Sequence, residues 1–324
     1  MKKAAVTAIA CLVLCCAMPA AAYAQELMVG GQAVGIQVGT KGVMVAGLSQ
    51  VTTDSGDKCP ASSAGIKKGD MITEINGAAV NKAAELIDTV ASLGGMPARL
   101  TIQRGDSALS VTVQPVQNTD GQWMMGMWLR DGVSGIGTIT FYDPISGTFG
   151  ALGHSINDAD SGTQMPLGDG CITGAEIVSV TRGTAGAPGE LSGCADVGQV
   201  LGSIDSNTAH GIFGKAYTAL GTQRLETGPI STGSATIIST VSGTAAREYS
   251  VEINRIYHDS EGTHVMLTVT DPTLLAQTGG IVQGMSGSPI IQDGKLVGAV
   301  THVFVNDPTR GYGIYIENML DAAG

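Results

Sequence analysis

Short β-branched segments separated by glycine fill the chain after about residue 118, and this pattern limits the fold more than any other feature. Examples are residues 137–142 (GTITFY), 235–239 (ATIIS) and 265–269 (VMLTV). Such segments are typical of strands joined by tight turns. Glycine is abundant (47 of 324 residues), and few residues are aromatic (4%) or charged (14%), which suits strands better than a helical bundle. We therefore predict an all-β domain over residues 118–324, formed by a barrel or a pair of barrels.

The first 24 residues have the pattern of a secretory signal. Two lysines precede an apolar run, and Ala22-Tyr23-Ala24 ends the segment with the small residues of a cleavage site. We predict cleavage before Gln25. A retained anchor is the alternative, since residues 4–24 are just long enough to span a bilayer. In both cases the rest of the protein is expected outside the cytoplasm.

Charge and cysteine content argue against two kinds of function. The formal net charge is −11 and lysine and arginine form no cluster, so a nucleic-acid partner is not expected. The sequence has no C-x-x-C motif and no paired histidine spacing, so we predict no metal and no cofactor. After the predicted signal, the cysteines are Cys59, Cys171 and Cys194. A disulfide between Cys171 and Cys194 and three separate buried thiols are both compatible with this count.

Residues 27–116 have the pattern of a smaller α+β domain. Short strand segments lead to residues 62–80 (SSAGIKKGDMITEINGAAV), where a strand is followed by an Asn76-Gly77 turn. Asn81 is a suitable N-cap for a helix that Gly94-Gly95 ends, and an alternating hairpin closes the domain. The segment AGIKKGDMITEINGAAV resembles the central signature of PDZ domains of bacterial proteases, and the order of the elements agrees with that family.

The resemblance to PDZ domains implies a peptide-binding site. A peptide would add as a strand beside residues 34–38 and lie against one face of the helix. Backbone amides near residues 33–36 would hold its carboxylate. The residues that this assigns to peptide binding are Val34, Gly35, Ile36, Ala83, Ile87 and Val90. For the three helix residues, ordinary core packing is the alternative.

Ser286 lies among small residues in the segment Gly-Met-Ser-Gly-Ser-Pro, directly before a predicted hairpin that turns at Asp293-Gly294. A serine hydroxyl attacks an acyl carbon only if a base takes its proton and amide donors stabilise the oxyanion. Small neighbours let two backbone N–H groups converge on one point. The segment resembles the nucleophile loop of chymotrypsin-like proteases, with the amides of Gly284 and Ser286 as the oxyanion hole. A simple tight turn is the alternative.

A base and an orienting acid are needed beside such a serine. The histidines are His154, His210, His258, His264 and His302. His154 follows a predicted strand in the small-residue segment GALGHSI, where a base would be approachable, whereas a structural role is the default for the others. His302 and Thr301 are candidates for a substrate wall, with strand packing as the alternative. Seven aspartates lie between His154 and Ser286, and Asp271 is favoured because it ends an apolar strand.

Three long segments of the second domain resemble the stage IV sporulation protein B serine peptidases of spore-forming bacteria. They are YDPISGTFGALGHSI, LTVTDPTLLAQTGGIVQGMSGSPI and GAVTHVFVNDPTRGYGIYIENML. Those proteins also carry a PDZ domain before a peptidase domain, so the resemblance covers nearly everything after the signal. It implies a trypsin/chymotrypsin-like barrel fold, with His154 as base, Asp271 as orienting acid and Ser286 as nucleophile.

The resemblance also implies a signalling role. Members of this family act between the two membranes around a developing spore, where they cleave themselves and a membrane-anchored regulator of an intramembrane metalloprotease. The Ala-x-Ala site is a departure, because a retained anchor would be expected in this role. Two alternatives are a general quality-control protease of the cell envelope and a catalytically silent scaffold that binds peptides through its PDZ domain.

Overall fold

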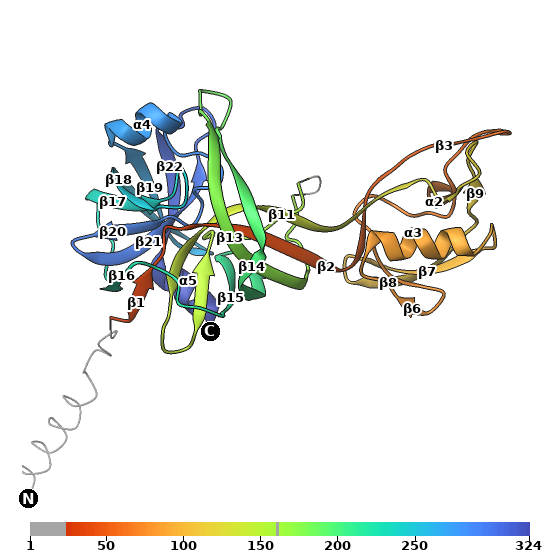
Figure 1. Ribbon diagram of the computed structural model, residues 1–324, viewed down its shortest axis with the longest axis horizontal. Coiled ribbons are helices and arrows are strands. Elements are labelled where there is room, and N and C mark those ends of the chain that lie inside the picture. The colour runs from red at the N-terminus through yellow and green to blue at the C-terminus, as the bar shows by residue number, and fades with distance from the viewer. Residues whose placement is uncertain (1–23, 160–161) are drawn as a thin grey trace, which may run out of the picture.

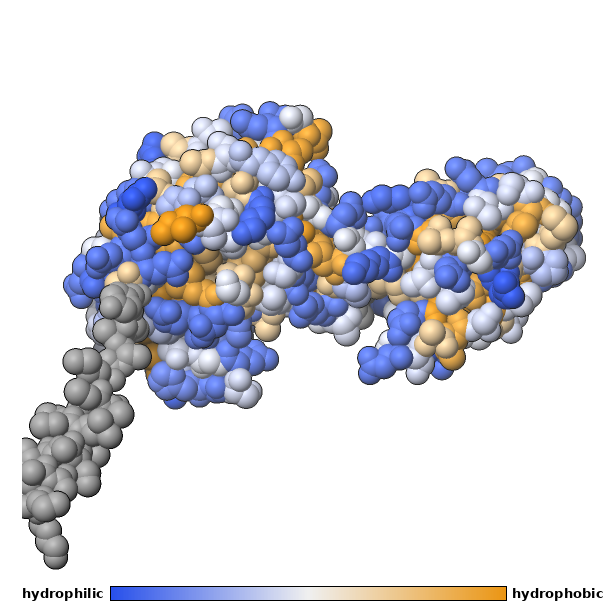
Figure 2. Space-filling view, turned by 90° about the horizontal axis from the view of Figure 1, so that it is seen from below, coloured by the Kyte–Doolittle hydropathy of each residue, from blue (hydrophilic) through white to orange (hydrophobic). Residues whose placement is uncertain are grey.

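A computed structural model describes residues 24–159 and 162–324 (Figure 1). Two lobes are joined by a narrow waist, which is also visible in the space-filling view (Figure 2). The predicted signal lies outside the described residues, except for its last position, Ala24. Among the helices that the structure describes, none is long and apolar enough to cross a membrane.

Six antiparallel strands of the larger lobe close into a first ring. In order around the ring they are β2 (Ala33–Leu48), β11 (Met127–Tyr142), β12 (Thr148–Ala151), β15 (Gly211–Ala216), β14 (Glu190–Thr208) and β13 (Leu167–Thr181). The ring closes because β2 pairs with β13 along one edge and with β11 along the other. Alternate residues of each strand point inward and form an apolar core that includes Val34, Ile36, Ile139, Phe149, Ile172 and Ile212.

A second closed barrel follows along the chain. Its strands, in spatial order, are β17 (Gly233–Ser239), β18 (Arg247–Asp259), β19 (Gly262–Val269), β22 (Arg310–Tyr315), β21 (Lys295–Val303) and β20 (Pro289–Gln292). The expected hairpin turn between β20 and β21 is present, with positive φ angles at both Asp293 (51°) and Gly294 (74°), as a type I′ turn requires. The prediction of a pair of barrels is therefore confirmed.

Short elements complete the larger lobe. Strand β1 (Glu26–Val29) pairs with β11 and with β16 (Gln223–Glu226). Helix α4 (Pro272–Thr278) follows β19, and α5 (Ile316–Ala323) ends the chain. The N-terminal strand is thus bound into the larger lobe, although it precedes the smaller one in sequence.

The smaller lobe is the predicted α+β domain. Its sheet contains β5 (Met71–Ile75), β6 (Ala78–Ala79), β7 (Ala98–Arg104) and β8 (Ser107–Val113), and its helices are α2 (Pro60–Ser63) and α3 (Ala83–Ser92). Two small hairpins are formed by β3 (Val51–Thr53) with β4 (Gly56–Lys58) and by β9 (Val116–Gln117) with β10 (Trp123–Met124). The cap of α3 differs by one residue from the prediction: Lys82 is the N-cap, and the Glu85 carboxylate accepts from the amides of Asn81 and Lys82.

An ion pair between the buried Asp70 and the partly exposed Arg104 explains the Gly-Asp turn of the PDZ signature. The Asp70 carboxylate is 1% exposed and accepts from Nε and Nη2 of Arg104 at 2.6 and 2.7 Å. It also accepts from the amide of Lys67 at 2.8 Å. Because a buried carboxylate needs such partners, Asp70 fixes the turn to the last strand residue of β7.

The boundary between the two lobes differs from the expected one. Residues 33–39 of β2 lie in the first ring, with Gly39 opposite Gly132 of β11, and only the second half of β2 enters the smaller lobe. The PDZ domain is therefore an insertion into the first ring, entered after Gly39 and left before Gly132. Sequence order hides this arrangement, since the strand that completes the ring precedes the inserted domain.

Candidate active site

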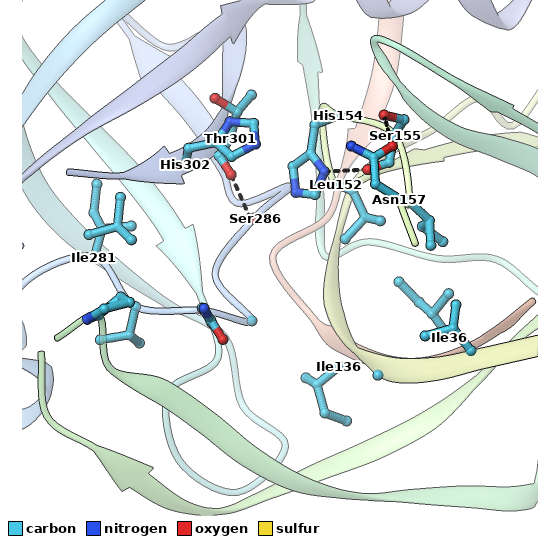
Figure 3. A pocket seen from close by; sticks show the side chains of 18 of the residues that line it. Ile36, Ile136, Leu152, His154, Ser155, Asn157, Ile281, Ser286, Thr301 and His302 are labelled. Carbon is cyan, nitrogen blue, oxygen red and sulfur yellow. Dashed lines mark hydrogen bonds between the residues drawn. The ribbon is translucent and has the colours of Figure 1, made fainter. Parts of the chain in front are cut away.

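His154 and Ser286 come from different barrels and line the same cavity, which has a volume of about 520 Å³ (Figure 3). His154 follows β12 of the first ring, and Ser286 precedes β20 of the second barrel. The structure thus brings together the predicted base and the predicted nucleophile, which are far apart in sequence.

Backbone geometry explains the small residues around Ser286. Gly284 and Gly287 have φ angles of 96° and 94°, in the left-handed region that favours glycine. A Cβ atom on Gly287 would lie 2.1 Å from the carbonyl oxygen of Thr138 in β11. The same strand holds the loop, because the Thr138 amide donates to the Ser286 carbonyl at 3.1 Å and its hydroxyl donates to the Gly284 carbonyl at 2.9 Å. Close contact with the first ring therefore requires glycine here.

Two peptide groups of this loop have their N–H groups free and their carbonyls held. The Gln283 carbonyl accepts from the Leu191 amide at 2.8 Å, so the N–H of Gly284 points the opposite way. The Met285 carbonyl accepts from the amide and the hydroxyl of Ser288, which fixes the N–H of Ser286 similarly. Within the described chain, neither amide donates a hydrogen bond. Two fixed, unused donors beside a serine are what an oxyanion hole needs.

The segment that carries His154 is held in an uncommon conformation. Leu152 and Gly153 have φ angles of 69° and 71°, and left-handed backbone is strained for a branched residue such as leucine. The Leu152 amide donates to the carbonyl of Thr138, the residue that also binds the serine loop. One strand of the first ring therefore positions both the base and the nucleophile.

The imidazole of His154 has a defined tautomer. Its Nδ1–H donates to the Ser155 carbonyl at 2.8 Å, which leaves Nε2 as a proton acceptor. Burial lowers the pKa of His154, and the Ser155 carbonyl opposes this only in part. The ring is therefore neutral at pH 7, which is the state that a general base requires.

Ser286 is held away from the base in this resting arrangement. Its hydroxyl donates to the carbonyl of Thr301 at 2.6 Å. Before it can donate to the imidazole of His154, the hydroxyl must turn away from Thr301 by rotation about the Cα–Cβ bond, which is a fast motion for a serine side chain. Thr301 and His302 both line the cavity, so the substrate-wall interpretation of these two residues fits their position.

A second histidine lies against the base. The rings of His154 and His302 have centroids 4.6 Å apart with planes tilted by 33°. Burial of the ring is the main cause that lowers the pKa of His302, to about 4, and repulsion from the charged form of His154 is the smaller one. His302 is thus neutral at pH 7. No local pattern in the sequence predicts this pair, because the two histidines lie in segments of different barrels.

Asp271 is not placed beside His154. Its Oδ1 accepts from the amides of Thr273 and Leu274 at 2.8 and 3.0 Å, so it is the N-cap of α4. Asp271 does not line the cavity, and no carboxylate of a described residue bonds to His154. The expectation that Asp271 orients the imidazole is not met in this arrangement. Asp271 was favoured because it ends an apolar strand segment, but β19 ends at Val269 and Asp271 starts a helix.

The expected peptide-binding strand has no free edge. Val34, Gly35 and Ile36 pair with Gly137, Ile136 and Gly135 of β11 on one side and with β13 on the other. No peptide strand can add there, and Ile36 lines the catalytic cavity instead. The assignment of these three residues to PDZ peptide binding is therefore wrong for this structure, because the first ring uses them.

The predicted helix face of the PDZ domain is only partly buried. Val90 of α3 is buried in the core, Ala83 is half-buried and Ile87 is 56% exposed. Residues 123–131 of the same chain lie near this helix. Trp123 and Leu129 pack against the same core, and the Asp131 carboxylate accepts from the Ala83 amide at 2.8 Å. Core packing thus accounts for Val90, while Ile87 stays open to solvent.

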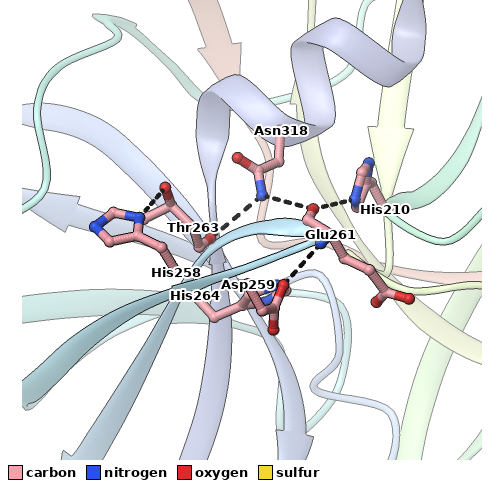
Figure 4. Close-up of polar contacts among 7 residues, drawn as sticks. All are labelled: His210, His258, Asp259, Glu261, Thr263, His264 and Asn318. Atoms are coloured by element: carbon pink, nitrogen blue, oxygen red, sulfur yellow. Dashed lines mark hydrogen bonds and ion pairs between the residues drawn. The ribbon is translucent and has the colours of Figure 1, made fainter.

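The remaining histidines have structural contacts around the β18–β19 turn (Figure 4): His258 and His264 lie on β18 and β19, and His210 lies in the turn between β14 and β15. The contacts join His210 Nε2 to the Glu261 carbonyl at 2.7 Å, His258 Nδ1 to Thr263 at 2.9 Å, and His264 Nε2 to Asp259 at 3.2 Å. In the part of the chain that the structure describes, no group of three or more His, Cys, Asp or Glu side chains could hold a metal ion.

The three cysteines that lie in the described part of the chain form no disulfide. Cys171 lies opposite Ser203 and Cys194 lies opposite Glu176, so the two thiols are five residues apart along the β13–β14 ladder. At about 3.4 Å per residue this separation exceeds disulfide reach. All three thiols are free. The alternative of three buried thiols is wrong as well, because Cys194 is exposed and Cys59 and Cys171 are only partly buried.

Comparison with known protein families fits this architecture. The model described as SpoIVB peptidase S55 matches residues 121–320, which is more than half of the chain. The chain belongs to the SpoIVB peptidase S55 family. A PDZ domain model matches residues 34–114. This S55 peptidase is therefore a serine peptidase with a PDZ domain, as the sequence predicted.

Individual relatives match only segments. A putative zinc metalloprotease, CPE1693 of Clostridium perfringens, is 34% identical over 68 residues, which are 21% of this S55 peptidase and 20% of that protein. The chain thus spans about a fifth of that relative's length. The PDZ domain of the SdrC-like protein Lmo2051 from Listeria monocytogenes is similar at 26% identity, covering 28% of this chain and 90% of that one (TM-score 0.24). The active form of the Rv3671c protease from M. tuberculosis is similar at 14% identity, covering 60% and 75% (TM-score 0.34).

Proposed function

We propose that this S55 peptidase is a signalling endopeptidase of spore formation, with Ser286 as nucleophile and His154 as general base. One observation carries the catalytic part: both side chains line one cavity beside the unused amides of Gly284 and Ser286. The signalling part rests on membership of the SpoIVB peptidase S55 family.

Acylation starts when the Ser286 hydroxyl turns from the Thr301 carbonyl towards Nε2 of His154. Nε2 takes the proton while Oγ bonds to the carbonyl carbon of the substrate. The amides of Gly284 and Ser286 then stabilise the oxyanion, and loss of one such donor typically costs about 10²–10³ in turnover. When the C–N bond breaks, the proton on Nε2 passes to the leaving amine and an ester remains on Ser286.

Deacylation uses the same groups with water as the nucleophile. Nε2 of His154 takes a proton from water, the hydroxide adds to the ester, and the returning proton restores the Ser286 hydroxyl. In both halves the imidazole becomes positively charged for a time. The Ser155 carbonyl stabilises that charge through the Nδ1–H bond, in the place where many serine peptidases have a carboxylate.

The insertion of the PDZ domain supports a regulatory role for it. Strands β2 and β11 carry the chain into and out of the PDZ domain, and the same strands supply Ile36, Val133 and Ile136 to the cavity wall. A peptide held by the PDZ domain is therefore connected to the catalytic cavity by two continuous strands. We propose that the domain presents or restrains substrates.

The proposed substrates are the chain itself and a membrane-anchored regulator of an intramembrane metalloprotease. The proposed location is the space between the mother-cell and forespore membranes. A secretory signal, or its retained form as an anchor, would deliver the protein to that side of the membrane. A quality-control protease is the second candidate, and it differs in having many cleavage sites in unfolded proteins.

Intact-mass analysis separates these two proposals. Purified residues 25–324 and the Ser286→Ala variant are incubated alone and with casein. A signalling peptidase should shorten itself at one or a few sites and leave casein largely intact. The Ser286→Ala variant should not shorten. Cleavage of casein at many sites by the wild type alone would favour the quality-control role instead.

A further inference from the structure

Strand β11 takes part in both lobes (Figure 1). From Gly132 onward it pairs with β2 in the first ring. Just before that point, the Leu129 side chain packs against the core of the PDZ domain, and the Asp131 carboxylate accepts from the Ala83 amide at the start of α3. Arg130 lies between these two fixed residues. Its backbone therefore belongs to the smaller lobe.

The side chain of Arg130 reaches across to the larger lobe. Its Nη1 donates to Oδ2 of Asp158 at 2.6 Å. Asp158 lies in the segment that follows β12 of the first ring, four residues after His154. The Asp158 side chain is 4% exposed, whereas that of Arg130 is 34% exposed. Because a carboxylate buried away from water needs a charged or hydrogen-bonding partner, this ion pair holds the segment of the base against the smaller lobe.

The segment that follows the base forms part of the catalytic cavity. Residues 154–157 line it, and the Ser155 carbonyl accepts the hydrogen bond that sets the tautomer of His154. Asn207 of β14 holds this segment from within the larger lobe. Its side chain accepts from the amide of Ile156 at 2.8 Å and donates to the carbonyl of the same residue at 2.9 Å. The orientation of the imidazole therefore depends on the anchors of this segment.

The ion pair joins two walls of the cavity. One wall is formed by residues 133–136 of β11, and the other by residues 154–157. Arg130 precedes the first wall by three residues, and Asp158 directly follows the second. The pair thus connects the two walls at the end that faces the smaller lobe. Its loss would remove an anchor from both of them.

We propose that Arg130 is a positioning residue for the general base, which it holds through Asp158. The base is then in its working position only while the smaller lobe is seated against the first ring. Displacement of that lobe withdraws the guanidinium, and the segment after His154 relaxes because its buried carboxylate loses this partner. The inference rests on the proposed role of His154 as base, and it names the regulation of that same site.

Labelling of Ser286 by a serine-reactive fluorophosphonate tests the proposal, with rates followed by intact mass on residues 25–324. Arg130→Met and Asp158→Asn should each slow labelling at least about 10-fold, as a share of the about 10²–10⁴-fold that a positioned base contributes. The double variant should be no slower than the single ones, because all of them remove the same interaction. Arg130→Lys should label within a few-fold of the wild type, since its ammonium pairs with the same carboxylate.

The chain offers a matched control in the ion pair inside the smaller lobe. Arg104 is 33% exposed and binds the 1% exposed Asp70 at 2.6 Å, so the two pairs have similar geometry and burial. Arg104→Met should label at the rate of the wild type. Hydrogen exchange gives a second readout, which does not depend on the reaction. Peptides that cover residues 154–158 should exchange faster in Arg130→Met than in the wild type, and should be unchanged in Arg104→Met.

The possible failures are distinguishable. Labelling of Arg130→Met at the wild-type rate, or equal slowing in Arg104→Met, would overturn the inference and leave Ser286 and its base in place. A double variant slowed by the product of the two single effects would overturn it as well, because the two side chains would then act separately. Asp158→Asn keeps the size of the side chain, so it decides the outcome if Arg130→Met does not fold. If the wild type does not label, the proposed function fails, and hydrogen exchange still shows whether Arg130 holds the segment.

Discussion

Removal of the PDZ domain at the boundary suggested by the sequence should unfold the peptidase. Deletion of residues 27–116 takes away β1 and the first half of β2 along with the PDZ domain. The first ring then lacks one of its six strands and β11 loses two neighbours. In contrast, replacement of residues 40–131 by Asn-Gly keeps both strands, since Gly39 and Gly132 lie opposite each other and an Asn-Gly turn suits a two-residue hairpin.

The size of the effect follows from burial. The lost segments contain five aliphatic residues that are each at most 5% exposed, namely Leu27, Val29, Val34, Ile36 and Val38. At about 1.5–3 kcal/mol for each buried side chain, their burial contributes about 7–15 kcal/mol as an upper estimate. This equals the whole free energy of unfolding of a typical domain, about 5–15 kcal/mol. The deletion of residues 27–116 is therefore not expected to fold.

Circular dichroism melts and limited proteolysis of both variants test this reasoning. The Asn-Gly variant should give a cooperative melt and a protease-resistant core, while the 27–116 deletion should give neither. The control is the full chain under the same conditions. A cooperative melt of the 27–116 deletion within a few degrees of the Asn-Gly variant would show that β1 and β2 are not part of the peptidase fold.

Three further perturbations follow from the site. Asp271→Ala should lower the free energy of unfolding by about 1 kcal/mol in urea melts, because the α4 cap is lost. Its kcat/KM should stay within a few-fold of the wild type, whereas a decrease in kcat/KM of about 10⁴ would mean that Asp271 reaches the base during catalysis. Gly287→Ala should reduce turnover at least about 100-fold, because its Cβ would meet the Thr138 carbonyl and displace the loop; near-normal peptide hydrolysis would contradict the loop geometry. The midpoint of the acidic limb in the pH profile of kcat/KM should lie below pH 6.5, because the lowered pKa keeps His154 neutral and active at lower pH. A midpoint above pH 6.5 would contradict the burial of the base.

Local patterns were sufficient to predict much of the fold and the two reacting groups. The Asn76-Gly77 and Asp293-Gly294 turns have the positive φ angles that their residue types suggest. Ser286 was recognisable because a tight loop with free amides requires glycine on both sides, and glycine leaves a visible mark in the sequence. His154 was recognisable from the small-residue segment before it.

Long-range pairing was not predictable from local patterns. Residues 34–38 have the composition of a strand in either lobe, and only their pairing with β11 and β13 assigns them to the first ring. Asp271 before a proline fits a strand end as well as an N-cap, so its role depends on the helix that follows. The contact of His154 with His302 depends on two barrels meeting, which no single segment encodes.

The central claim is that Ser286 is an activated nucleophile with His154 as its base. Labelling with a serine-reactive fluorophosphonate is the most direct test, and mass spectrometry identifies the labelled peptide. The proteins compared are the wild type, Ser286→Ala, His154→Ala and a control, Ser242→Ala, which alters an exposed serine outside the cavity. The expected result is one label on Ser286 in the wild type and in Ser242→Ala, and no label in Ser286→Ala. Labelling of His154→Ala should be slowed at least about 100-fold. Labelling of Ser286→Ala at the rate of the wild type, or of His154→Ala without any slowing, would contradict it.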